Sequence, residues 1–221
     1  MKNYILIIAL LLGTVTVSWS QKVINKKVDV QGKKAELKFD FADTIHIEAW
    51  NKNTIELEVT CNIDNNRYND YYSLNVTEQS GTVNLVEKVD FDGIKKAKGT
   101  KSLNNFNTNI NYTLKVPADL EFSLKTISGK IELVGSRGKM SVNSISGFID
   151  YSIPIATKAH INLSTVTGNV YSDVKFDKSN ASKEISWVGT KQELSLNGGS
   201  TPVELKTVSG DIYLRKLKGV N

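Results

Sequence analysis

A ten-residue pattern of apolar and polar positions occurs four times in the second half of the chain. Its rule is apolar, any, apolar, any, Ser/Thr, Ile/Val, Ser/Thr, Gly, any, Ile/Val, and the copies begin at Phe122, Met140, Ile161 and Val203. The glycines at the eighth position lie 18, 21 and 42 residues apart; they are Gly129, Gly147, Gly168 and Gly210. A period near twenty residues is typical of stacked structural repeats, so the pattern predicts a repeat architecture.

Within each copy the apolar period changes after the first Ser/Thr. Phe122 and Leu124 alternate as on a strand with one buried face, but after Thr126 the apolar residues shift by one position, to Ile127 and Ile131. A straight strand would then turn its apolar residues toward solvent, so we expect the chain to bend or bulge here. Glycine suits such a corner because it adopts backbone angles that side chains forbid and permits close approach by a neighbouring chain.

These corners predict an all-β, single-domain protein in which the copies stack as rungs of a β-solenoid, each rung covering the apolar face of the next. A set of antiparallel hairpins with Ser-Gly turns is the alternative. Residues 171–193 hold no copy of the pattern near Gly189, where a period of 21 would place one. Either a degenerate rung or a loop is expected there.

The recurring Thr-Ile/Val-Ser-Gly-x-Ile unit resembles the bacterial β-strand-repeat "putative adhesin" family, a domain of unknown function also called toastrack. Three further stretches strengthen the resemblance, at residues 45–50, 112–117 and 197–214. The resemblance covers about residues 36–216. It implies a β-repeat protein with a role in adhesion or in envelope-stress sensing.

Alternating apolar positions also precede the repeats and predict N-terminal antiparallel hairpins. Residues 45–49 are expected to pair with residues 55–63, and residues 72–76 with residues 83–85 through a turn at Gln79-Ser80-Gly81. Residues 21–34 are expected to form a mobile lead-in, and residues 87–107 an exposed loop. We expect residues 21–116, the hairpins and basic loop, to cap the same domain as the repeats of residues 117–221.

The start of the chain has the character of an export signal. Lys2 precedes an apolar run over residues 4–12 that is shorter than a membrane span, and small residues precede Gln21. This pattern predicts a cleaved signal peptide over residues 1–20, with an uncleaved anchor as the alternative. The protein is then expected in the periplasm, on the outer surface or secreted, with no transmembrane span after signal removal. Cys61 is the only cysteine and lies in phase with apolar strand residues, so we expect it to be buried.

Charge changes this picture at one place. The formal net charge is +5, and acids and bases alternate in most strands. The exception is a lysine cluster in the expected loop, formed by Lys95, Lys96, Lys98 and Lys101. It is either a solvated loop or a contact for an anionic envelope polymer or lipid headgroups. Nucleic-acid binding is disfavoured by the export signal and by the lack of basic residues alternating with aromatic ones.

Candidate chemistry is sparse. His46 and His160 do not have metal-ligand spacing, and we expect no catalytic residue, cofactor or metal. Glu132 and Asp150 occupy equivalent positions three residues after Gly129 and Gly147, so adjacent rungs would hold them about 5 Å apart. Two solvated acids screened by Lys130 are the expected outcome. A carbohydrate-active β-solenoid enzyme, a lyase or hydrolase, is the alternative.

A binding face has more support in the sequence. Residues one and three places after each corner glycine are expected to point outward, and they include Phe148, Tyr171 and Tyr213. Stacked aromatic rings beside hydrogen-bonding groups can hold sugar rings or an apolar patch of a partner, or they can simply stabilise the sheet. The sequence therefore predicts a non-catalytic, exported envelope protein that acts through its surface as a binding or structural scaffold.

Overall fold

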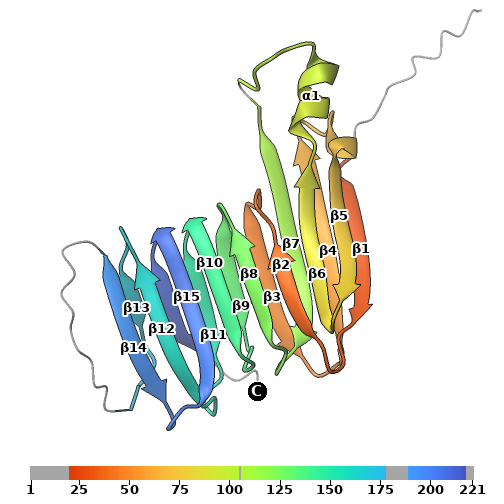
Figure 1. The fold of residues 1–221 in the computed structure, drawn as a ribbon. Coiled ribbons are helices and arrows are strands. Elements are labelled where there is room, and N and C mark those ends of the chain that lie inside the picture. The colour runs from red at the N-terminus through yellow and green to blue at the C-terminus, as the bar shows by residue number, and fades with distance from the viewer. Residues whose placement is uncertain (1–19, 105, 178–188, 218–221) are drawn as a thin grey trace, which may run out of the picture.

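Two eight-stranded β-sheets pack face to face in the computed structural model, which describes residues 20–104, 106–177 and 189–217 (Figure 1). The strand order of sheet A is β1 (Lys22–Asp29), β4 (Thr54–Ile63), β7 (Thr108–Pro117), β3 (Thr44–Trp50), β9 (Lys130–Val134), β11 (Ile149–Ile153), β16 (Ile212–Lys216) and β13 (Val170–Ser172). The strand order of sheet B is β14 (Thr190–Leu196), β12 (Ala159–Thr165), β15 (Thr201–Ser209), β10 (Met140–Ser146), β8 (Phe122–Thr126), β2 (Lys34–Lys38), β6 (Thr82–Val89) and β5 (Tyr72–Gln79). The all-β prediction is confirmed.

Each copy of the sequence pattern forms one strand of sheet B, a tight corner and one strand of sheet A. In the first copy, Phe122 and Leu124 of β8 point inward, and after the corner Ile131 and Leu133 of β9 also point inward. The bend expected after Thr126 therefore carries the chain from one sheet to the other. The apolar core lies between the sheets, and its largest wholly buried side chains include Tyr72, Tyr112 and Tyr151. We call each such pair of strands a rung.

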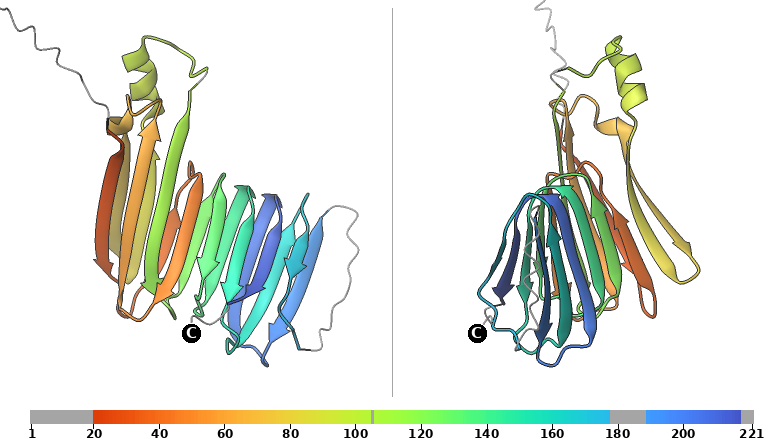
Figure 2. Two further views of the ribbon diagram at one scale, coloured as in Figure 1. Left: turned by 180° about the vertical axis from the view of Figure 1, so that it is seen from behind. Right: turned by 60° about the vertical axis from the view of Figure 1, so that its left-hand side comes forward.

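Five rungs pair in parallel and in register, but not in chain order. β2 and β3 also form a rung, and the spatial order is β2/β3, β8/β9, β10/β11, β15/β16 and β12/β13 (Figures 1 and 2). The fourth copy of the pattern therefore lies between the second and third. The corner glycines follow this order: a Cβ added to Gly147 would lie 2.1 Å from the Gly129 carbonyl oxygen, and one added to Gly210 would lie 2.0 Å from that of Gly147. The same approach recurs at Gly168, whose added Cβ would lie 1.8 Å from the Gly210 carbonyl oxygen.

The 42-residue interval between the last two copies contains an additional strand, β14, in place of the degenerate rung or the loop that the sequence predicts. Gly189 precedes β14, which runs antiparallel to β12 and closes the end of sheet B. Residues 178–188 lie outside the described part of the chain. The interval is long because the third copy lies at the end of the row of rungs, whereas the fourth lies between β10 and β12.

The buried Ser/Thr at the fifth position of each copy stabilises the corner. The Thr207 hydroxyl donates to the Gly147 carbonyl oxygen at 3.1 Å, and the Thr165 hydroxyl donates to that of Gly210 at 2.8 Å. In the first and second copies the hydroxyl donates within its own corner, from Thr126 to the Ser128 carbonyl oxygen at 2.6 Å and from Ser144 to that of Ser146 at 3.1 Å. This position is therefore polar although its side chain is buried, because it satisfies a corner carbonyl.

We expect Thr207→Val to lower the free energy of unfolding by about 1–2 kcal/mol, because the isosteric side chain leaves the Gly147 carbonyl without its donor. Urea unfolding measures the change. Thr201→Val is the matched control, since Thr201 is a half-buried residue at the other end of the same strand. Equal losses in both variants would contradict this role of the hydroxyl.

The N-terminal third differs from its predicted pairing. Residues 45–49 and 55–63 do not form a hairpin, because β7 lies between β3 and β4 and pairs with both. Residues 22–29 are not a mobile lead-in but strand β1, which pairs antiparallel with β4. The hairpin of β5 and β6 is confirmed. β7, which follows this hairpin in the chain, lies beside β3, in the position that sequence proximity would give to β4.

Residues 87–107 contain a helix, α1 (Phe91–Lys98), instead of only a loop, and a short 3-10 helix (Asn69–Tyr71) packs nearby. The Asp90 side chain caps α1 by accepting from the Gly93 amide at 2.9 Å, and Gly99 ends it in the left-handed conformation. Ile94 is its only fully buried residue. A helix of eight residues with one buried side chain has too few turns for a helical period to be recognised in the sequence.

Candidate binding surface

One row of side chains crosses the outer face of sheet A through all eight strands. Cross-strand partners link it from β1 to β13 as Asn25, Glu58, Thr113, His46, Glu132, Asp150, Tyr213 and Tyr171. Seven intervals of strand spacing make this outer row about 34 Å long. The outer row therefore changes from polar at β1 to aromatic at β13, and it contains several of the residues singled out in the sequence.

The aromatic end of the outer row brings together the three predicted rings. Tyr171 and Tyr213 stack with ring centroids 5.2 Å apart and planes 16° apart, and Phe148 meets Tyr213 edge-on at 6.0 Å. Tyr171 is 48% exposed and lies on the edge strand of sheet A. We call Phe148, Tyr213 and Tyr171 the aromatic trio.

Hydrogen-bonding groups surround the aromatic trio. The Tyr213 hydroxyl lies 3.2 Å from Asp211 Oδ2, and the Asn169 backbone N–H donates to Asp211 Oδ1 at 2.8 Å. The Arg215 guanidinium lies 5.1 Å from the centroid of the Tyr213 ring. Ring faces next to fixed polar groups are the combination that an amphipathic ring, such as a sugar, can use.

Glu132 and Asp150 are direct cross-strand neighbours, as the repeat spacing predicts. Glu132 forms an ion pair with Lys130, and His46 Nδ1 lies within hydrogen-bond distance of Glu132 Oε2 at 3.1 Å. Asp150 pairs instead with Arg215, whose Nε lies 2.9 Å from both carboxylate oxygens. The Lys130 hydrogen bond, followed by that of His46, lowers the pKa of Glu132. The predicted screening by Lys130 therefore applies to Glu132 and not to Asp150.

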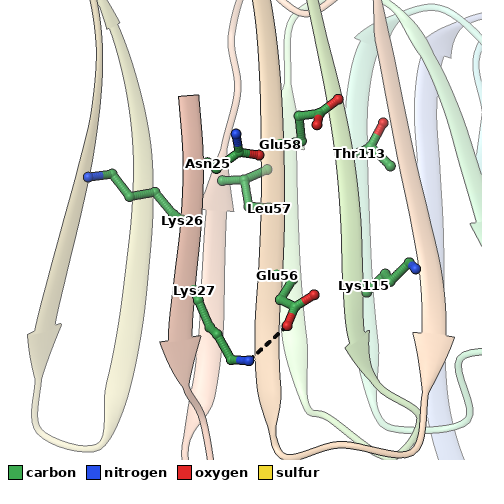
Figure 3. A pocket seen from close by; sticks show the side chains of 8 residues that line it. All are labelled: Asn25, Lys26, Lys27, Glu56, Leu57, Glu58, Thr113 and Lys115. Carbon is green, nitrogen blue, oxygen red and sulfur yellow. Dashed lines mark ion pairs between the residues drawn. The ribbon is translucent and has the colours of Figure 1, made fainter. Parts of the chain in front are cut away.

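The polar end of the outer row borders an open hollow of about 430 Å³ over β1, β4 and β7 (Figure 3). Its walls carry alternating charges, and Lys27 pairs with Glu56 at 2.9 Å. The Lys27 hydrogen bond is the main cause of a lowered pKa at Glu56. Asn25, Glu58 and Thr113 point into the same region from neighbouring strands (Figure 3). The sequence does not predict this hollow, because one of its walls is β1, in the segment expected to be a mobile lead-in.

The four predicted lysines do not act as one group. Lys98 is held by Asp64 at 3.0 Å and lies over the rings of Tyr68 and Phe106, so it attaches α1 to the sheets. Lys95 pairs with Asp92 at 3.1 Å within the helix. Lys96 and Lys101 are exposed. The cluster is therefore partly structural.

A buried polar cluster lies between the sheets near α1. Glu87 is 7% exposed, and its Oε2 accepts from the Phe41 amide at 2.9 Å. Burial raises the pKa of Glu87 to about 7, and the neighbouring Asp40 and Asp43 add to the rise. Tyr72 and Tyr112 hydroxyls lie 3.1 Å apart, and burial raises the pKa of both.

Cys61 is buried beside this region, as predicted, and burial raises the pKa of its thiol to about 12. A thiol in this state is a poor nucleophile. Within the described ranges, no three or more His, Cys, Asp or Glu side chains come together as a metal ion would require. No helix of the described part is long and apolar enough to cross a membrane.

The fold is similar to that of a solved "putative cell adhesion protein" from Clostridium sporogenes, with a TM-score of 0.54 and 13% identity over 89% of this chain and 100% of that chain. A "putative adhesin" from Parabacteroides merdae is 15% identical over 68% of this chain and 60% of that chain, with a TM-score of 0.31. No family model matches the chain, and no curated protein matches its sequence. The first of these structures supports, at the level of fold, the resemblance to the "putative adhesin" family.

Proposed function

We propose that the protein is a non-catalytic, exported envelope protein that binds a ring-containing ligand, such as a polysaccharide, through the aromatic trio. The contact of three rings from separate rungs at the exposed end of the outer row carries this proposal. The row extends the surface across the whole sheet, which suits a long, linear polymer. A small-molecule ligand would need a more enclosed site.

The ion pairs of the two adjacent acids support a role without catalysis. A glycosidase needs one carboxyl group that keeps its proton near neutral pH and a second that is ionised. The pKa of Glu132 is lowered, and the carboxylate of Asp150 is paired with Arg215. Both acids are held by cationic or hydrogen-bonding side chains on the outer face of sheet A, and not in the apolar pocket in which a general acid keeps its proton.

Export and domain organisation belong to the same proposal. Residues 1–20 act as a cleaved signal peptide, residues 21–116 cap the domain and residues 117–221 carry the repeats of a solenoid-like stack. The in-register parallel pairing of the rungs supports the stack. A role as a binding or structural scaffold in adhesion or envelope-stress sensing follows from the resemblance.

We expect Tyr171→Ala to reduce binding to a panel of immobilised bacterial envelope and plant polysaccharides by about tenfold or more, because ring stacking and burial at this position are lost. Tyr171→Phe keeps the ring and is expected to retain binding. Surface plasmon resonance measures both variants. Asn143→Ala, on the outer face of sheet B, is the control.

Two outcomes would contradict the proposed function. Binding that is unchanged in Tyr171→Ala and in Tyr213→Ala would exclude the aromatic trio as the recognition surface. Turnover of a polysaccharide that is abolished by Glu132→Ala or Asp150→Ala would establish catalysis and favour the enzyme alternative.

A further inference from the structure

A line of aliphatic side chains is exposed along the corners, where the repeat pattern places Ile or Val. Ile127, Ile145, Val208 and Val166 are 42%, 55%, 47% and 40% exposed. They follow the in-register residues Thr126, Ser144, Thr207 and Thr165, so they lie side by side on consecutive rungs. We call these four residues the corner ridge. Its repeated exposure is unusual, because single exposed aliphatic side chains are scattered on most proteins.

The corner ridge is rigid. The Ile127 carbonyl accepts from the Ser146 amide at 2.8 Å, and the Val208 carbonyl accepts from the Thr167 amide at 3.0 Å, so adjacent corners are hydrogen-bonded. The side chains are β-branched and have few rotamers to lose on binding. The ridge is therefore preformed for contact with an apolar environment.

A row of lysines runs parallel to the corner ridge on the outer face of sheet B. On the four rungs of the ridge it lies two residues before each ridge residue, and cross-strand pairing continues it onto β2 and β14. Its members in spatial order are Lys38, Lys125, Asn143, Lys206, Ser164 and Lys191. We call its four cations the lysine row, and all four are exposed. Within the described residues, Lys125 and Lys191 have no ion-pair partner, whereas Lys38 pairs with Asp40 and Lys206 with Glu204.

Acidic side chains lie mainly one row further from the corner. That row contains Glu36, Ser123, Ser141, Glu204, Asn162 and Glu193. Three carboxylates are closer to the corners: Asp40 and Asp43 at the β2/β3 end, and Asp211, which is hydrogen-bonded to Tyr213 and to the Asn169 backbone amide. On the sheet A side, Lys130 lies 5.6 Å from the centroid of the Phe148 ring. Polarity thus changes from aliphatic to cationic to acidic away from the corner.

We propose that the corner ridge and the lysine row bind the surface of an anionic lipid bilayer. Aliphatic side chains enter the boundary between headgroups and acyl chains, and lysines one row behind meet lipid phosphates, which is the layering of interfacial membrane binders. A protein partner is disfavoured because the ridge is one side chain wide, and a stable protein interface needs about 800 Å² on each partner. Binding is weak and reversible, because only four half-exposed side chains enter the bilayer.

Vesicle co-sedimentation tests the proposal. We expect the protein to bind vesicles of phosphatidylcholine mixed with phosphatidylglycerol, to bind pure phosphatidylcholine poorly, and to dissociate in high salt. The double substitution Ile145→Thr and Val208→Thr is expected to lower the partition coefficient about tenfold or more. Lys125→Gln with Lys191→Gln is expected to lower it by a similar factor on anionic vesicles only.

Matched variants separate this surface from others. Ile155→Thr alters a 71% exposed aliphatic residue outside the ridge, and Lys95→Gln with Lys96→Gln alters lysines of α1; both are expected to bind nearly as the wild type does. Circular dichroism checks that each variant is folded. The proposal would be overturned if the wild-type protein did not bind anionic vesicles. It would also be overturned if the ridge variant and the lysine-row variant both bound them as tightly as the wild type does. Tyr171→Ala is expected to bind vesicles normally, so failure of the polysaccharide proposal is distinguishable.

Discussion

Gly147→Ala is expected to lower the free energy of unfolding by about 4 kcal/mol, which is a large part of the 5–15 kcal/mol typical of a domain. Two causes add. Gly147 has φ +122°, where a side chain is strained, and its added Cβ would lie 2.1 Å from the Gly129 carbonyl oxygen, a backbone atom that cannot rotate away. Thermal unfolding should show a fall in Tm of about 8 °C or more for a protein of this size.

Two other glycines separate these causes. Gly198 has φ +68° with nothing within 4 Å of an added Cβ, so Gly198→Ala measures the backbone strain alone, about 1 kcal/mol. Gly168 has an added Cβ 1.8 Å from the Gly210 carbonyl oxygen without a left-handed φ, so Gly168→Ala measures the close approach alone. Stability loss in Gly168→Ala no greater than in Gly198→Ala would show that the rungs are not held this closely.

Glu87→Gln is expected to gain stability relative to the wild type as the pH rises. The change that it makes in the free energy of unfolding should be more favourable at alkaline pH than at pH 4 by up to about 3 kcal/mol, at 1.36 kcal/mol per pKa unit. Burial raises the pKa of Glu87 from 4.5 to about 7. The folded protein thus retains a proton that the unfolded chain releases between these values. The contribution of the wild-type carboxyl to stability is complete below pH 4.5 and is lost as the pH rises through 7.

Urea unfolding from pH 4 to pH 9 measures this effect as the difference between variant and wild type. Glutamine has no proton to lose, and its carbonyl oxygen still accepts from the Phe41 amide, so the difference should grow with pH and level off above 7. Glu58→Gln, on the exposed outer face, controls for a general change in charge. A difference for Glu87→Gln that does not vary with pH would show that this carboxyl does not titrate in the range.

The repeat pattern was sufficient to predict the corners, the neighbouring positions of Glu132 and Asp150, and the grouping of Phe148, Tyr171 and Tyr213. Each of these follows from local spacing once rungs pair in register. The alternation of apolar residues fixes which face is buried, so the core followed from the same pattern. These features need no information about the order of the rungs.

The rest depended on long-range pairing, which spacing does not encode. β7 separates β3 from β4 although β3 and β4 adjoin in sequence, and β15 lies between β10 and β12. The corner ridge has a local signal, the shift of the apolar period after Thr126. A bend that keeps all apolar residues inside predicts a buried Ile127, but Ile127 is exposed at the end of the outer face of sheet B. The lysine row needed β14, whose register with β12 brings Lys191 beside Ser164.

The place of the fourth copy has a consequence for biosynthesis. A ribosome releases the third copy before the fourth, yet the third has its native neighbour only after β15 and β16 have entered between it and the second. Zippering from one end, which linear arrays permit, therefore stops two rungs short, and the vacancy is filled by the last segment to emerge. Completion is a late insertion step, because in a nascent chain that stops before residue 201 neither β10 nor β12 has its native neighbour β15.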